Sequence, residues 1–554
     1  MRVTLLMLIL ATGMIAVGCG TQDAATAADV AIDIVAVDAV DASSDLAFEV
    51  ADTQETWSPL PKVDYLIVTA DGLVQTAQSF ADYRESTGHT VVTITVSEVK
   101  SGQGLATDAS IRAGIQEWVR AHFELRDKDR PFFLLIVGDA HWSDNPVDQC
   151  VPAGQWAGGW QGAWSDNHYA DMDMDRVPDL AVGRLPIRTN PVGLDILERI
   201  VQHETTYVVG PWNRRIGVYA GEGGFGEDVD FFIETVAQEG LESVPYEYDL
   251  SFAYNSTGSV YYYAPFKDKV LDMVTEGAVL VTFMGHGGGE LNVQDLDDVV
   301  PRDRFPMYAF FACSTGDFLS SVDCETEVVF KQAGGPMAIL ASTATTHPYA
   351  NAVNALEMEA AVFEDRPETF GEAIRLMKWR SMYNTSDLRE MIDTFAVLYM
   401  EAWEMPATIE DHMYSYNLLG DPATRIRFPA GAVEVQAEDT VTGATVEFSG
   451  TVDNILSGTA QVKLVAERAK LLHTLDPVEN PQDQSQWPQV QENWEKAVDK
   501  TACECDVEVS DGAFGGTLEV PPKTPPGNYF VTVYADDGVV DAVGSVQIKV
   551  KKAP

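Results

Sequence analysis

The sequence has little positive charge and few cysteines, and both shortages restrict what the protein can be. Its 554 residues include 36 Lys and Arg against 85 Asp and Glu, which gives a formal net charge of −49. A surface this acidic repels nucleic-acid phosphates, so we expect no nucleic-acid binding. Six cysteines are too few for a disulfide scaffold in a chain this long. Apolar residues make up 46% of the chain, which excludes disorder over most of its length.

Long apolar runs are also missing, apart from one near the N-terminus. Val3 to Val17 is uncharged; this length is short for a membrane span and typical of a signal-peptide core. The run ends in Ala16-Val17-Gly18-Cys19, which resembles the bacterial lipobox, where the cysteine is lipidated. We therefore expect a lipoprotein signal peptide over residues 1–18 and a lipid anchor on Cys19. An ordinary signal peptide followed by a chance cysteine is the alternative.

The next segment, residues 19–61, is rich in Ala and Asp and contains no Lys, Arg or His. This composition predicts an acidic, solvated tether that holds a folded body away from a membrane; an inhibitory pro-segment is the alternative. Together, the two segments place the protein in the bacterial cell envelope, lipid-anchored at the outer membrane or cell surface. We expect the lipid anchor to be its only membrane contact.

Apolar strand-like runs alternate with amphipathic helical runs from residue 62 onward. The expected strands are Tyr65–Thr69, Thr90–Val96, Pro131–Val137, Leu180–Arg184, Arg215–Ala220, Ala278–Met284, Met307–Ala312 and Met337–Ala341. The expected helices are Gln75–Ser86, Ser110–Phe123, Val192–Tyr207, Asp228–Gln238 and Glu325–Gln332. Such alternation predicts an α/β fold with parallel sheets covered by helices. The pattern restarts near Trp212, which suggests two α/β subdomains, residues 62–211 and 212–428.

Two reactive side chains follow consecutive expected strands. His286 lies in Gly285-His286-Gly287 after one strand, and Cys313 directly follows the next. Because the carboxyl ends of neighbouring parallel strands meet at one sheet edge, we expect the imidazole and the thiol to lie side by side. A histidine can take the proton of a thiol, and glycines let a substrate backbone approach. Either residue alone is more often structural, but together they favour catalysis. His347 is a second candidate base, without the flanking glycines.

Four motifs, in order along the chain, resemble the gingipain family of cysteine peptidases, whose fold is related to that of the caspases. They are Tyr169–Pro186, Val281–Gly287, Phe311–Phe318 and Asn417–Pro422. The resemblance implies a caspase-like fold and an endopeptidase that acts on protein or peptide substrates, with no cofactor for the chemistry. It implies Cys313 as the nucleophile that forms a thioester acyl-enzyme and His286 as general acid/base. It also implies oxyanion donors at the backbone N–H groups of Gly287 and Cys313, and Asp179 as the acid that orients His286.

The segment before the Gly183-Arg184 strand is unusually acidic. Asp171, Asp173, Asp175 and Asp179 alternate as do carboxylates that wrap around calcium, although the loop departs from an EF-hand. Structural calcium would also suit the family that the sequence resembles. The alternative is a solvated acidic turn. If Asp179 binds metal, it is less free to orient His286. Asp166 is a further candidate ligand.

Substrate preference is harder to predict. The resemblance implies an acid soon after the Gly183-Arg184 strand in arginine-specific members, but Ile187–Asn190 contains none. The sequence therefore leaves the residue preference at the cleaved bond open.

The cysteines that remain fall into two pairs. Cys150 and Cys324 could form a disulfide, whereas Cys503 and Cys505 are too close in sequence to pair easily.

The pattern changes to period-two alternation after residue 428. Strands are expected at Val433–Gln436, Thr445–Ser449, Ala460–Val465, Gly516–Val520, Asn528–Tyr534 and Ala542–Val550. They predict an all-β immunoglobulin-like sandwich over residues 429–554, with a polar insertion near 467–502.

One alternative to the enzyme is a non-catalytic surface binding protein that retains the peptidase fold. The presence of both Cys313 and His286 favours the enzyme. The sequence leaves the oligomeric state and the physiological substrate open.

Overall fold

The computed structural model describes most of the chain after residue 61. The described residues are 62–103, 107–140, 148–158, 162–206, 208–221, 234–238, 240–287, 303–320 and 322–554. The expected signal peptide, Cys19 and the tether lie outside the described residues. Residues 228–233 of the expected helix Asp228–Gln238 also lie outside them. Within the described ranges, no helix is both long and apolar enough to cross a membrane.

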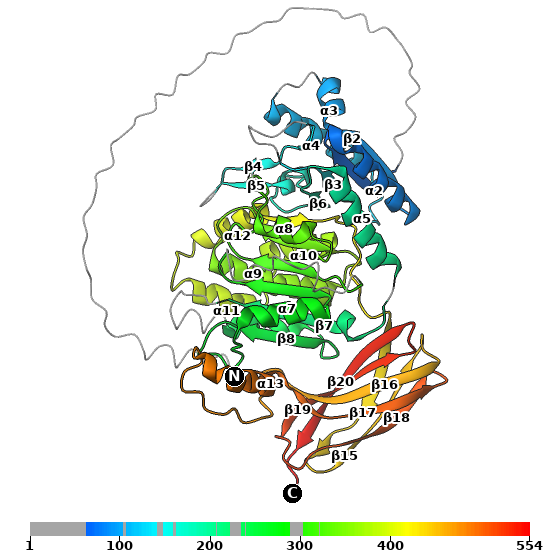
Figure 1. Ribbon diagram of the computed structural model, residues 1–554, viewed down its shortest axis with the longest axis vertical. Helices are drawn as coiled ribbons and strands as arrows, with labels where there is room; N and C mark the ends of the chain where they lie inside the picture. Colours follow the sequence, from blue (N-terminus) through cyan, green and yellow to red (C-terminus); the bar gives the residue numbers. More distant parts are fainter. Residues whose placement is uncertain are drawn as a thin grey trace, which may run out of the picture. The chain divides into compact units, whose positions relative to one another are not determined.

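A ten-stranded sheet forms the centre of the α/β part (Figure 1). Its strand order is β2-β1-β3-β6-β12-β11-β10-β9-β7-β8. The strands are β1 (Tyr65–Thr69), β2 (Val91–Thr95), β3 (Phe133–Val137), β6 (Ala181–Leu185), β7 (Arg215–Ala220), β8 (Asp249–Tyr254), β9 (Leu280–Met284), β10 (Met307–Phe311), β11 (Ala338–Ser342) and β12 (Tyr416–Leu419). Every residue of β1, β3, β9, β10 and β11 is buried, as expected for strands covered on both faces.

The sheet has two parallel halves, and β12 joins them. Strands β2, β1, β3 and β6 pair in parallel, and so do β11, β10, β9, β7 and β8. Strand β12 runs antiparallel to β11 and parallel to β6, which it meets at Leu419 and Arg184. The predicted α/β fold is therefore confirmed, with one continuous sheet across its two halves. Neither β12 nor β8 was expected as a strand.

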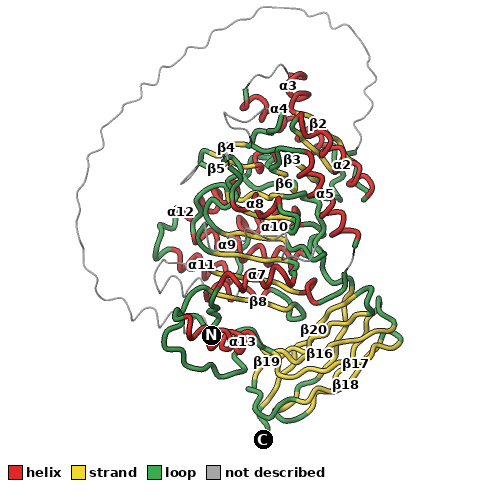
Figure 2. Tube along the Cα trace, in the orientation of Figure 1, coloured by secondary structure: helices red, strands yellow, loops and turns green. Residues whose placement is uncertain are grey.

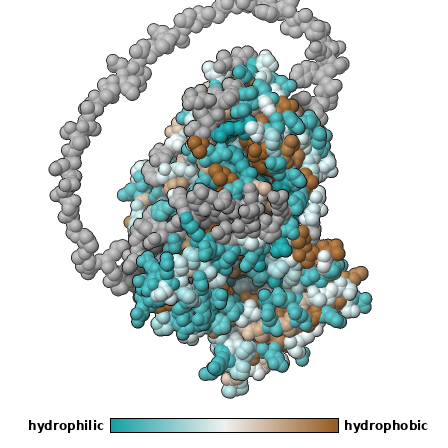
Figure 3. Space-filling view, viewed as in Figure 1, coloured by the Kyte–Doolittle hydropathy of each residue, from teal (hydrophilic) through white to brown (hydrophobic). Residues whose placement is uncertain are grey.

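Helices surround this sheet (Figure 2). They are α2 (Val74–Ser86), α3 (Val96–Gln103), α4 (Asp108–Glu124), α5 (Asn190–Thr205), α7 (Phe266–Glu276), α8 (Glu325–Lys331), α9 (Pro348–Ala360), α10 (Phe370–Tyr383), α11 (Asp387–Ala396) and α12 (Glu404–Ser415). A short hairpin of β4 (Gly154–Trp156) and β5 (Ala163–Ser165) lies outside the main sheet. The face seen in Figure 3 is mostly hydrophilic, in keeping with the acidic composition.

The C-terminal part is an all-β domain, as predicted. Its strands are β13 (Gly431–Ala437), β14 (Thr440–Val441), β15 (Thr445–Val452), β16 (Ser457–Ala466), β17 (Thr501–Ser510), β18 (Ala513–Glu519), β19 (Gly527–Asp536) and β20 (Asp541–Lys551). Pairing of β13 with β20 closes the sheet on itself. Strand β17 was not expected. The immunoglobulin-like identity of this domain stays a prediction.

The polar insertion of this domain is folded and contacts the α/β part. It contains α13 (Trp487–Val498), where the Trp494 indole N–H donates to the carbonyl of Phe252 in β8 at 2.9 Å. Before that helix, the Arg468 guanidinium donates to the carbonyl oxygens of Leu241 and Val244 at 2.7 and 2.6 Å. The insertion therefore attaches the all-β domain to the sheet edge formed by β8.

Candidate active site

The register of two neighbouring strands brings His286 and Cys313 to the same sheet edge. Strands β9 and β10 pair in parallel, and Met284 lies opposite Phe311 at their carboxyl ends. His286 and Cys313 each follow two residues beyond that pair. Backbone hydrogen bonding between β9 and β10 therefore brings the two residues to the same end of neighbouring strands. The His286 side chain is exposed and Cys313 is half-buried, so both can meet a substrate.

The backbone of Gly287 packs directly against that of Cys313. A Cβ atom built on Gly287 would overlap the carbonyl oxygen of Cys313 and lie 3.1 Å from its carbonyl carbon. Real Cβ atoms do not approach backbone this closely, so a larger residue would push the two segments apart. Glycine is required here for close approach, and this contact fixes the His286 segment against the segment that carries the thiol.

A hydrogen-bond network surrounds the Cys313 sulfur. The backbone N–H of Thr346 donates to Sγ at 3.4 Å, and the Thr346 hydroxyl lies 3.5 Å from it. Behind Thr346, the Asn351 amide donates to that hydroxyl at 2.9 Å, and the Tyr416 hydroxyl donates to Asn351 at 2.7 Å. The thiol also lies 3.6 Å from the carbonyl oxygen of Thr346, so contacts with this one residue hold the sulfur in position. The sequence carried no signal for Asn351 or Tyr416.

A strained turn follows the thiol. Ser314 has a φ of +51°, in the left-handed region that non-glycine residues rarely adopt. Its N–H donates to the carbonyl of Ala344 at 2.9 Å, and the N–H of Gly316 donates to that of Ser342 at 2.8 Å. These bonds to the last residue of β11 and to the segment after it hold the turn in place. Such strain is typical of functional sites, and here it lets the chain reverse directly after Cys313.

Burial disfavours the thiolate form of two other described cysteines. Burial, followed by the charge of Glu327, raises the pKa of Cys324 to about 12, and burial raises that of Cys503 to about 11. Both thiols are therefore protonated at neutral pH, and the thiolate is the reactive form. Cys150 is buried, and it forms no disulfide with Cys324.

The second candidate base, His347, acts as a helix cap. It is the N-cap of α9, where its ring Nδ1 accepts from the N–H of Tyr349 at 3.2 Å. Its own backbone N–H donates to His412 at 2.8 Å. Burial lowers the pKa of His347. This structural role accounts for the residue, so His286 remains the better candidate.

The acidic loop brings three carboxylates together. Oxygen atoms of Asp171, Asp173 and Asp179 all lie within 4.8 Å of one another. Asp175, which the sequence grouped with them, instead accepts from the Tyr383 hydroxyl at 2.9 Å. The loop thus forms a triad of carboxylates, Asp171, Asp173 and Asp179, and Asp175 of the expected set is not part of it.

Burial and mutual repulsion act on this triad. Burial raises the pKa of both Asp171 and Asp179, and neighbouring carboxylates add to each shift. Asp171 accepts from the N–H groups of Met174 and Arg176 at 2.7 and 3.1 Å. These bonds pull the loop around the carboxylates. A divalent cation would relieve the repulsion, so the donor set fits calcium.

The position of Asp179 separates it from His286. Asp179 lies two residues before β6, and three strands, β12, β11 and β10, stand between β6 and β9. Four strand spacings amount to about 19 Å. In addition, one carboxylate oxygen of Asp179 accepts from the N–H of Met172 at 2.7 Å. The geometry therefore favours the metal role of Asp179 over orientation of His286.

Asp166, the further candidate ligand, is committed to an ion pair. Both of its oxygens bind the buried guanidinium of Arg184, at 2.7 and 2.6 Å. Arg184 also donates to the carbonyl oxygens of Gly138 and Val151. The conspicuous Gly-Arg strand motif thus has a structural purpose, which is to tie the ends of β3 and β6 to neighbouring loops.

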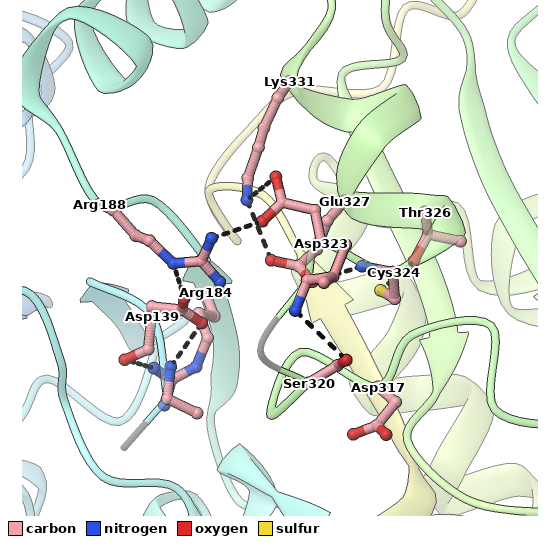
Figure 4. Close-up of polar contacts among 12 residues, drawn as sticks. Asp139, Arg184, Arg188, Asp317, Ser320, Asp323, Cys324, Thr326, Glu327 and Lys331 are labelled. Carbon is pink, nitrogen blue, oxygen red and sulfur yellow. Dashed lines mark hydrogen bonds and ion pairs between the residues drawn. The ribbon is translucent and has the colours of Figure 1, made fainter. Parts of the chain in front are cut away.

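An ion-pair network links these loops to the segment after the nucleophile (Figure 4). Arg188 binds Asp139 at 2.6 Å and Asp323 at 3.0 Å, and Lys331 binds Asp323 at 2.8 Å and Glu327 at 3.0 Å. Burial raises the pKa of Asp139 and of Glu327. The residue that follows the Gly-Arg strand in this network is Arg188, which is basic. This agrees with the lack of an acid in residues 187–190 of the sequence.

The sequence matches one family model over more than half of the chain. The sequence model of peptidase family C25 matches residues 58–427. The crystal structure of the Arg-specific cysteine proteinase gingipain R (RgpB) is 17% identical and covers 88% of this chain and 98% of its own, with a TM-score of 0.49. The complex of Porphyromonas gingivalis RgpB pro- and mature domains is 16% identical and covers 88% of this chain and 100% of its own, with a TM-score of 0.48. A further protease structure is 14% identical and covers 88% of this chain and 98% of its own, with a TM-score of 0.51. No curated protein matches the sequence.

Proposed function

Because the chain belongs to peptidase family C25, the gingipain family, and is a cysteine peptidase, we propose that Cys313 and His286 form its catalytic dyad. The observation that carries this proposal is the register of β9 and β10, which brings both residues to one sheet edge. The packing of Gly287 against Cys313 supports it. We propose protein or peptide substrates and endopeptidase cleavage.

The dyad acts in two stages. His286 accepts the proton of the Cys313 thiol, and the thiolate attacks the carbonyl carbon of the scissile peptide bond. The backbone N–H groups of Gly287 and Cys313 donate to the oxygen that becomes negative. His286 then gives its proton to the leaving amine, and a thioester acyl-enzyme remains. In the second stage His286 takes a proton from water, whose oxygen attacks the thioester carbonyl carbon. The C–S bond then breaks, His286 returns the proton to Cys313 Sγ, and the carboxylic acid product leaves.

Calcium has a structural role in this proposal. Asp171, Asp173 and Asp179 would hold it, because their oxygens converge. When bound, the ion neutralises the carboxylates and cross-links the loop before β6. The catalytic residues need no cofactor for their chemistry.

We also propose that the protein is lipid-anchored through Cys19 in the bacterial cell envelope, at the outer membrane or cell surface. The support is the apolar run of residues 3–17 that ends at this cysteine. Incorporation of a labelled fatty acid into the protein, and its loss in Cys19→Ala, tests this proposal.

Hydrolysis of a mixed fluorogenic peptide library tests the enzymatic proposal. The purified protein should cleave the library, and Cys313→Ala and His286→Ala should not. Equal hydrolysis by the protein and by Cys313→Ala would overturn the proposal. Absence of cleavage by folded protein with calcium present would favour a non-catalytic binding protein instead.

A further inference from the structure

A groove of about 580 Å³ lies between α9, α10, α11 and α12. Its walls are largely apolar, and the lining residues include Met382, Val397, Met405, Pro406 and Ile409. This volume is in the range of sites that hold ligands or side chains of a partner. Methionine side chains adapt to differently shaped apolar groups. The groove is therefore suited to large apolar side chains of varied shape.

The floor of the groove carries little net charge. Arg389 pairs with Asp393 at 2.8 Å, and the Tyr349 hydroxyl donates to Asp393 at 2.9 Å. Arg389 also donates to the carbonyl of Ser381 at 2.7 Å. Glu390 also lines the groove and is exposed to solvent. An apolar side chain that enters beside Arg389 and Asp393 leaves their ion pair intact.

The rim of the groove is unusually apolar for a surface. Val397, Leu398, Tyr399 and Trp403 are 47%, 54%, 55% and 73% exposed, and all four lie in the short connection between α11 and α12. Of these four residues, Val397 also lines the groove. Exposed apolar residues gathered on one surface segment are typical of interaction sites.

The groove begins close to the nucleophile. Tyr349, which lines it, lies three residues after Thr346, whose N–H donates to Cys313 Sγ. Three residues span at most about 10 Å, which is also the length of about three residues of an extended substrate. The N–H of His347, between them, binds His412 of α12. The first turn of α9 thus connects the residue whose N–H donates to Cys313 Sγ with a residue that lines the groove.

We propose that this groove is a substrate-binding site that accepts a large apolar side chain of the polypeptide, about two to four residues from the scissile bond. The inference rests on the proposed function, because it identifies the occupant as the substrate. It makes the enzyme selective for apolar, extended polypeptide segments and gives a source of specificity that does not depend on the residue at the cut bond.

The test measures peptide binding in the absence of turnover. Fluorescein-labelled decapeptides with leucine fixed at one position are compared with decapeptides that have serine there, all other positions being mixed. Their affinities for Cys313→Ala are measured by fluorescence anisotropy. We expect tighter binding of the leucine set, and roughly tenfold weaker binding of that set when Val397→Asp is added. The affinity for the serine set should change by less than about twofold when Val397→Asp is added.

Two further variants keep the result interpretable. Trp403→Ser alters the exposed rim only, and should weaken binding of the leucine set by a smaller factor. Val539→Asp introduces the same charge at a site that is 71% exposed in the all-β domain. It should leave the affinities for both peptide sets unchanged. Equal affinities of Cys313→Ala and its Val397→Asp derivative for the leucine set would overturn the groove proposal.

Failure of the proposed function gives a different result. If the groove is a substrate site and the dyad is wrong, leucine peptides still bind in a Val397-dependent manner, but the unmodified protein cleaves none of them. If the dyad is right and the groove proposal is wrong, the protein cleaves peptides and Val397→Asp lowers kcat/KM equally for both sets or for neither.

Discussion

The sheet edge at Cys313 and the acidic loop before β6 acquire their geometry in different ways. At the sheet edge, parallel pairing of β9 with β10 places His286 and Cys313 without help from side chains. In the acidic loop, carboxylates accept from the N–H groups of their own loop, and this decides which of them converge. A site built on strand register can be predicted from strand order, whereas a site built on loop hydrogen bonds can be predicted only in composition.

The largest expected effect is at the nucleophile. Cys313→Ala should reduce kcat/KM by at least about a thousandfold, because the covalent step is lost. Steady-state hydrolysis of the best library peptide measures the change. Cys324→Ala is the matched control and should retain activity, since burial keeps that thiol protonated. Loss of activity in Cys324→Ala but not in Cys313→Ala would show that the strand register has been misread.

Gly287→Ala tests the close approach at the sheet edge. The new Cβ atom would overlap the Cys313 carbonyl oxygen, so we expect kcat to fall by about a hundredfold through displacement of His286 and of the oxyanion donor. Gly258→Ala is the control, because no atom lies within 4 Å of a Cβ there. Wild-type kcat in Gly287→Ala would contradict the packing of the two segments.

The acidic loop can be tested with calcium. Calcium should raise the melting temperature by several degrees when its concentration greatly exceeds Kd. Asp173→Asn should abolish this rise, and Asp175→Asn should retain it, because Asp175 lies outside the triad. Differential scanning calorimetry with calcium or with EGTA measures the shift.

Asp179→Asn separates the two roles proposed for that residue. As a metal ligand, it should lose the calcium effect while kcat at saturating calcium falls only slightly. A large loss of kcat with an unchanged calcium effect would instead identify Asp179 as the acid that orients His286.

A buried acid behind the sheet edge predicts a pH dependence of stability. Glu359 is buried, accepts from the Thr282 hydroxyl of β9 at 2.9 Å, and burial raises its pKa to about 7. The folded state therefore binds a proton that the unfolded state has released, and stability falls as pH rises. From the ordinary pKa of 4.5 up to about 7 the loss is about 3 kcal/mol. Urea unfolding at pH 5 and 8 measures it.

Glu359→Gln should remove this part of the pH dependence, because it keeps the shape and cannot ionise. Glu434→Gln, at an exposed position of β13, should leave it unchanged. The same slope of stability with pH in the Glu359→Gln variant and the wild type would rule out Glu359 as its source.

The smallest effect is expected at Thr346. Thr346→Val removes the hydroxyl that lies 3.5 Å from Cys313 Sγ but keeps the backbone N–H that donates to it. We expect kcat to fall by about two- to fivefold, the cost of one weak hydrogen bond. An unchanged KM with this reduced kcat would confine the effect to the reacting sulfur.

The sequence predicted those parts of the fold in which apolar runs are continuous. Strands β1, β3, β7, β9, β10 and β11 fall within two residues of the expected bounds. Strand β8 was not predicted, because Asp249 and Ser251 interrupt its apolar pattern, and β17 was not, because its Glu and Asp residues resemble the polar insertion before it. Strand β12 is four residues long and is a strand only through its pairing with β11 and β6.

The candidate site was predictable to a similar extent. His286 and Cys313 follow apolar strands, so strand order sufficed to bring them together. Thr346 contacts the sulfur, and Asn351 and Tyr416 stand behind it only through tertiary packing of α9 and β12, which no local pattern encodes. The convergence of Asp179 rather than Asp175 with Asp171 depends on how the loop turns at Met174 and Arg176, which both have positive φ.

The most direct test of the dyad is the rate at which each cysteine is alkylated by iodoacetamide at pH 6, followed by peptide mass spectrometry of the folded protein. Cys313 should react far faster than Cys150, Cys324, Cys503 and Cys505. His286→Ala should abolish that advantage, and unfolding in urea should remove it as well. A Cys313 rate equal to that of Cys324, or one that His286→Ala leaves unchanged, would contradict the catalytic dyad.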